Sequence, residues 1–175
     1  MGCEIMTGQP YNGGMLRFGT SDPAIATAER ITWGNGTTDA IYLALMDNSY
    51  VQVVTSTHWS DISTYEQTPT GNYVTGGQLL TTAPPYIEAT LLTPFNCVVY
   101  TANSGSTPAY SMSWTGQVFT NISGAVLYKK NAGATSTWPL LCFISSLSTV
   151  TANNDTYSVM FGTPGTTLGI WHRVL

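Results

Sequence analysis

Charged side chains are scarce in this chain, and the residues that replace them favour extended backbone. Only 8% of the 175 residues are Asp, Glu, Lys or Arg, against about 25% in typical soluble domains. Thr, Val, Ile, Tyr, Phe and Trp are abundant, whereas stretches rich in Ala, Glu and Lys are absent. Clusters of Gly, Pro and Asn recur about every ten residues, as they do in sandwiches and barrels. We therefore expect an all-β fold, an antiparallel β-sandwich or jelly-roll-like barrel with an extended N-terminal arm.

The length fits one domain of about 100–200 residues. We expect residues 1–20 to form the arm, because the glycine-rich run 8–14 is predicted to hold no regular element. Residues 21–175 are then a single β domain. A short helix is expected at 24–30, where Pro23 would lie near its first turn, and a strand through 31–33 competes with it.

Residues 40–46 are the clearest predicted strand. They are apolar at every position, which indicates that both faces are covered. A single helical turn is expected at 57–62. Period-two alternation at 110–114 indicates a strand with one buried face. Further strands are expected at 78–82, 96–101, 110–115, 124–130, 140–145, 157–161 and 168–174.

The charge balance excludes several classes of partner. Five Lys and Arg against nine Asp and Glu give a net charge of −4, so we expect no nucleic-acid partner and no polybasic attachment to a membrane. No apolar run approaches about 18 residues, and the first residues lack the pattern of a secretory signal. The cysteines are odd in number and lack a CxxC pair, so Cys97 and Cys142 are expected to be buried thiols of a chain folding in a reducing cytoplasm.

Few residues suggest catalysis or metal binding. His58 and Asp61 have a spacing that supplies half of a metal site, but a histidine that caps or packs on a short turn is the favoured interpretation. His172 is expected at a solvent-facing or interface position. There is no GxSxG or GxxxxGK[ST] motif, and the acidic residues are scattered. We therefore do not expect this protein to be an enzyme, and we expect no catalytic, cofactor-binding or metal-binding residues and no cofactor.

The low charge itself suggests partner subunits. Exposed strand edges are normally guarded by Lys, Glu or Pro, so either a barrel closes here or other subunits cover the edges. Obligate interfaces are poor in Lys and Glu but rich in aromatic residues and Met. The composition of this chain is similar, which favours cover of the edges by other subunits. Tyr11, Leu16 and Phe18 in the arm are the expected partner contacts, the alternative being that they pack on their own domain. Deleting residues 1–20 is then expected to leave the domain folded.

The tryptophans are expected in a core or interface rather than on a sugar-binding platform.

An ordered set of segments resembles small virion proteins of tailed bacteriophages. The opening strand, a Tyr-containing loop and a "H-x-F-x-D-I" turn are followed by a "G-A-V-I-Y-K" strand and a closing "G-I-F-R-L". In this chain the similar segments are 38–47, Tyr50, 58–62, 72–77, 119–129, 140–144 and 169–173. The resemblance covers residues 38–175 and does not extend to 1–37.

The resemblance implies a β-rich structural component of the virion. On this basis we expect a capsid decoration (cement) protein, made in the bacterial host cytoplasm, that binds the major capsid protein on the capsid exterior. It would stabilise the shell by bridging capsomers, as a homo-oligomer with a trimer favoured by analogy. The alternative is a tail- or fibre-associated protein that binds a host surface glycan.

Overall fold

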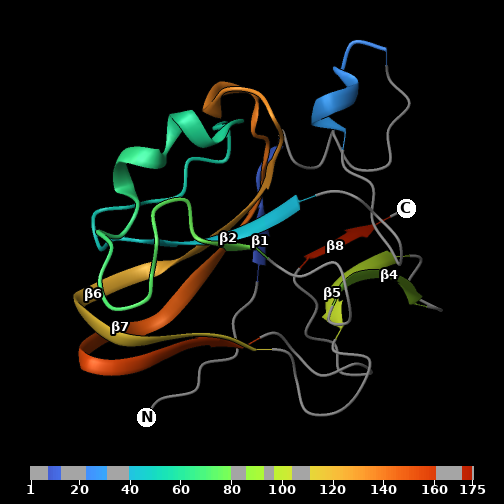
Figure 1. Ribbon diagram of the computed structural model, residues 1–175. Helices are drawn as coiled ribbons and strands as arrows, with labels where there is room; N and C mark the ends of the chain where they lie inside the picture. Colours follow the sequence, from blue (N-terminus) through green and yellow to red (C-terminus); the bar gives the residue numbers. More distant parts are fainter. Residues whose placement is uncertain are drawn as a thin grey trace.

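The computed structural model describes residues 8–12, 23–30, 40–79, 86–92, 97–103, 111–160 and 171–174 (Figure 1). The described part consists of antiparallel strands, short 3₁₀ turns and loops, and it contains no helix of seven or more residues. The predicted all-β class is therefore confirmed. None of the helices in these ranges is long and apolar enough to cross a membrane.

The strands that the structure describes form two sheets. The first has the order β1-β7-β6-β2-β3 and the second the order β4-β5-β8. The strands of the first are β1 (Gly8–Pro10), β2 (Ala40–Met46), β3 (Gln78–Leu79), β6 (Ser111–Lys130) and β7 (Leu140–Met160). Those of the second are β4 (Tyr86–Leu92), β5 (Cys97–Asn103) and β8 (Trp171–Val174). The 3₁₀ turns within the described ranges are η1 (Thr27–Glu29), η2 (Trp59–Asp61), η3 (Ser63–Tyr65) and η4 (Thr135–Thr137).

Strands β6 and β7 form one long antiparallel hairpin, drawn in gold and orange in Figure 1. The sequence predicted two shorter strands in place of each, which is wrong. Turn-forming residues inside both strands caused the error. Gly116 and Asn154 adopt left-handed backbone, with φ of 65° and 55°, and the pairing shifts register near them. Such bulges take up turn-like residues without ending the strand.

The second sheet keeps the register of this hairpin. Ser111 pairs with Met160 at the open end of the hairpin, and Cys97 of β5 pairs with Val174 of β8. Cys97 lies 14 residues before Ser111, and Val174 lies 14 residues after Met160. The β5–β8 pairing therefore has the same register as the β6–β7 pairing at the open end of the hairpin. The neighbouring strand β4, which pairs with β5, was not predicted from the sequence.

Strand β2 is covered on both faces, as predicted. The side chains of Leu43 and Leu45 on one face and of Ala44 on the other are completely buried. The segment between β2 and β3 packs against the face of the first sheet on which the Tyr128 side chain lies. Trp59 stacks on that ring with centroids 4.5 Å apart.

Residues 8–10 join the first sheet. Gly8 pairs with Ile144 and Pro10 with Cys142, which places β1 beside β7. The prediction that run 8–14 holds no regular element is therefore wrong for β1, because the edge of β7 supplies its hydrogen-bond partners. The remainder of the predicted arm lies outside the described residues, apart from Tyr11 and Asn12.

Two helical predictions fall within the described residues. The helix expected at 24–30 is only the 3₁₀ turn η1, whereas the turn expected at 57–62 is confirmed as η2. The competing strand at 31–33 lies outside the described residues.

Candidate functional site

The loop that follows β2 exposes apolar side chains. Val51, Val53 and Val54 are 77%, 54% and 48% exposed, and we name these three residues the valine loop. No Asp, Glu, Lys or Arg occurs from residue 48 to residue 60. The ring of Tyr65, itself exposed, lies beside that of Tyr50 with centroids 5.7 Å apart. Large exposed apolar patches are typical of contact sites for partners, so we take the valine loop as the candidate functional site.

Hydrogen bonds hold the valine loop in shape. The backbone amide of Ser56 donates to the carbonyl of Val53 at 2.9 Å, and that of Asn12 donates to the carbonyl of Val54 at 3.0 Å. At the start of the loop, the Asp47 carboxylate accepts hydrogen bonds from the amide and the hydroxyl of Ser49. A loop ordered before binding loses less conformational entropy when it meets a partner.

Tyr11 supports this loop from within the core. Its side chain is completely buried, its hydroxyl is hydrogen-bonded to that of Tyr50, and its amide donates to the carbonyl of Leu141. Burial raises the pKa of both tyrosines. Tyr11 was expected to contact a partner, but the structure places it on its own domain, which is the alternative interpretation. Leu16 and Phe18, the other two expected contacts, lie outside the described residues.

The half-buried carboxyl of Glu66 connects the neighbouring segment to the sheet through hydrogen bonds. One oxygen of Glu66 accepts hydrogen bonds from the Tyr73 hydroxyl at 2.8 Å and from the Gly76 amide at 2.6 Å. The Tyr73 hydroxyl in turn accepts from the amide of Leu45 at 3.0 Å. Desolvation by burial raises the pKa of Glu66, although these hydrogen bonds oppose the shift. The contacts tie the 66–76 segment to β2.

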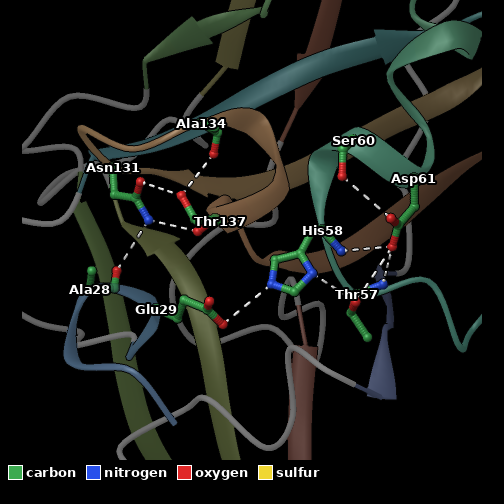
Figure 2. A network of polar contacts seen from close by, with 9 residues as sticks. All are labelled: Ala28, Glu29, Thr57, His58, Ser60, Asp61, Asn131, Ala134 and Thr137. Carbon is green, nitrogen blue, oxygen red and sulfur yellow. Dashed lines mark hydrogen bonds and ion pairs between the residues drawn. The ribbon is translucent and has the colours of Figure 1, made fainter.

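His58 and Asp61 form the cap of the turn η2. One oxygen of Asp61 accepts hydrogen bonds from the amides of Thr57 and His58, at 2.8 and 3.1 Å (Figure 2). Partial burial raises the pKa of Asp61, but these hydrogen bonds outweigh it and the net shift is downward. The favoured interpretation, a histidine that caps or packs on a short turn, fits this geometry. In the part of the chain that the structure describes, no group of three His, Cys, Asp or Glu is placed to hold a metal ion.

The described tryptophans do not form an open platform for a sugar. Trp59 and Trp114 are buried. Trp138 is half-buried, and the ammonium of Lys130 lies 4.9 Å from the centroid of its ring and from that of Tyr42. The lysine thus occupies these two aromatic faces by a cation–π contact. Trp33 lies outside the described residues, as do the side chains of Trp171 and His172.

Sequence reasoning missed the valine loop. The signal that predicts it is the uncharged interval from 48 to 60, which begins directly after Asp47 and so just beyond the 40–46 strand. That interval alone does not separate a buried strand from an exposed loop, so exposure had to come from the structure.

Comparisons of this chain with known protein families, curated proteins and solved structures find no match.

Proposed function

We propose that this chain is a structural protein of a phage virion, a capsid decoration (cement) protein that binds the exterior of the shell. The observation that carries the proposal is the valine loop, an exposed, uncharged and well-held apolar surface. The resemblance of residues 38–175 to small virion proteins of tailed phages and the low charge of the chain both favour this function. In this proposal the two sheets belong to a sandwich or jelly-roll-like barrel.

The proposed mechanism is bridging between capsomers. The valine loop packs against uncharged surface of the major capsid protein, and a homo-oligomer, with a trimer favoured, presents several such loops at once. Simultaneous engagement raises the apparent affinity without any new kind of contact. Because the contact depends on apolar burial, it weakens little as the salt concentration rises.

The test replaces each valine of the loop by threonine, which keeps the shape and exchanges a methyl group for a hydroxyl. If all three side chains are buried on the shell, each change costs about 1 kcal/mol, so the triple variant loses roughly 100-fold in affinity per site. Val118→Thr is the matched control. The exposed fraction of Val118, 53%, is nearly that of Val53, but Val118 lies on β6 and not in the loop. Occupancy on purified particles is measured by gel densitometry, with circular dichroism to establish that both variants fold.

Unchanged occupancy of the triple variant would remove the valine loop from the proposal. Equal loss in the Val118→Thr control would show that the effect is not specific to the loop. The copy number per particle tests the location. Hundreds of copies support the shell, whereas a handful would favour the tail- or fibre-associated alternative.

A further inference from the structure

The valine loop needs support beyond its own side chains. Val51, Val53 and Val54 are exposed, so burial of their apolar surface contributes little to fixing the loop. Fixing the backbone costs conformational entropy, which other contacts must offset. The hydrogen bond from the amide of Ser56 to the carbonyl of Val53 lies within the loop itself. Contacts with other segments are therefore needed to hold the loop against the domain.

Residues 8–12 are such a segment, and they are themselves fixed to the first sheet. Strand β1 pairs with β7. The amide of Tyr11 continues this contact by donating to the carbonyl of Leu141 at 3.0 Å, and the Tyr11 side chain is completely buried. The segment therefore has a defined position on the sheet where it meets the valine loop.

Two contacts join this segment to the two ends of the valine loop. The hydroxyl of Tyr11 is hydrogen-bonded to that of Tyr50, the residue directly before Val51. The amide of Asn12 donates to the carbonyl of Val54 at 3.0 Å. The valines are thus held between two points on one fixed segment.

The chain that follows the loop has its own attachment to β7. The amide of Leu140 donates to the carbonyl of Thr57 at 3.0 Å, and the amide of Trp59 donates to the carbonyl of Trp138 at 2.8 Å. Residues 8–12 take no part in these two hydrogen bonds. Loss of a link between residues 8–12 and the valine loop should therefore loosen the loop while leaving η2 in place.

We propose that residues 8–12 position the valine loop for its partner, Asn12 through its backbone amide and Tyr11 through its hydroxyl. Because this segment holds both ends of the loop, the loop is ordered before binding and loses less entropy when it meets a partner. The apparent affinity for the partner falls in proportion to the fraction of molecules in which the loop is ordered. That the partner is a capsid rests on the proposed function, whereas the positioning of the loop does not.

Hydrogen exchange of the full chain, followed by mass spectrometry, tests the positioning. Asn12→Pro removes the backbone donor, whereas Asn12→Ala keeps it and removes only the exposed side chain. We expect Asn12→Pro to exchange about 2- to 10-fold faster at residues 51–56, the range that corresponds to one backbone hydrogen bond. Asn12→Ala should retain the slow exchange of the wild type. The amides of Asp61 and Ile62, which donate to the carbonyls of His58 and Trp59 at η2, should keep the wild-type rate in both variants.

A second variant tests the other link and serves if Asn12→Pro does not fold. Tyr11→Phe combined with Tyr50→Phe removes both hydroxyls of the pair, so neither is left buried without its partner. This double variant should also exchange faster at residues 51–56 than the wild type, with a smaller change at η2. Circular dichroism establishes that each variant is folded.

The outcomes that overturn the positioning are specific. Wild-type exchange at residues 51–56 in Asn12→Pro, or in the double variant where Asn12→Pro does not fold, would overturn it. An equal rise at η2 would do the same, because it would show a general loss of stability. Equally fast exchange in Asn12→Ala would overturn the role of the backbone amide.

Particle occupancy separates this inference from the proposed function. If the triple valine-to-threonine variant keeps full occupancy while Asn12→Pro exchanges faster in the loop, the proposed function fails and the positioning stands. If the triple variant loses occupancy but Asn12→Pro exchanges as the wild type does, the positioning alone fails.

Discussion

Replacement of Tyr11 by alanine should destabilise the domain strongly, although Tyr11 lies only a few residues from the N-terminus. Its side chain is completely buried and belongs to the main hydrophobic cluster. Truncation of a buried aromatic side chain typically costs about 3–5 kcal/mol. Since small domains are stable by only about 5–15 kcal/mol, this loss is a large fraction of the whole.

The hydroxyl of Tyr11 can be tested separately. Tyr11→Phe keeps the ring but leaves the buried hydroxyl of Tyr50, 4% exposed, without this partner, at a cost of about 1–3 kcal/mol. Removing both hydroxyls leaves no such group. The double variant with Tyr50→Phe should therefore lose less than the two single variants together.

The assay is urea unfolding followed by tryptophan fluorescence, because the buried Trp59 and Trp114 report loss of the core. Tyr65→Ala is the control, since Tyr65 is 40% exposed and should cost about 1 kcal/mol or less. A loss below about 1 kcal/mol for Tyr11→Ala would refute the placement of Tyr11 in the core. If particle occupancy fell while stability stayed constant, the expectation of a partner contact would be restored. By the same reasoning, deletion of residues 1–20 removes β1 and Tyr11 and should destabilise the domain, contrary to the sequence-based expectation.

Three further experiments test other parts of the structure. Gly77 has φ of 69°, and a Cβ atom there would lie 2.1 Å from the Leu43 carbonyl oxygen. Gly77→Ala should therefore lose at least about 1–2 kcal/mol in urea unfolding, and an unchanged midpoint would contradict this backbone geometry. Folding raises the pKa of Glu66, chiefly by desolvation, so its contribution to stability is greatest at low pH and is lost as the pH rises through the raised value. Glu66→Gln should accordingly gain on the wild type as the pH increases above 4.5, whereas a constant difference in unfolding free energy would exclude the effect. Cys142 is fully buried with a raised pKa, so a thiol reagent should label it only in urea, and rapid labelling of Cys142 itself in the folded chain would show that the site opens.

Local chemistry alone was sufficient to predict several elements. The apolar run of β2 predicted a strand covered on both faces, and the burial of Leu43 and Ala44 confirms it. The turn at η2 followed from short-range sequence signals, as did the β5 and β8 strands in part. These predictions hold because hydrophobic periodicity and turn residues act over a few neighbouring positions.

Long-range pairing decided the rest. Gly116 and Asn154 suggest turns in isolation, but the partner strand turns them into bulges inside β6 and β7. From sequence alone, Gly8–Pro10 is predicted to be part of an irregular arm. In the structure it is a strand, because the edge of β7 supplies its hydrogen-bond partners.

The sequence by itself determined the all-β class, the scarcity of charge and the uncharged interval after β2. Only the tertiary structure decided that the valines of this interval are exposed, that Tyr11 is in the core, and that His58 meets Glu29 from 29 residues away. Exposure and contact depend on which distant segments the chain brings together, and no local pattern encodes that.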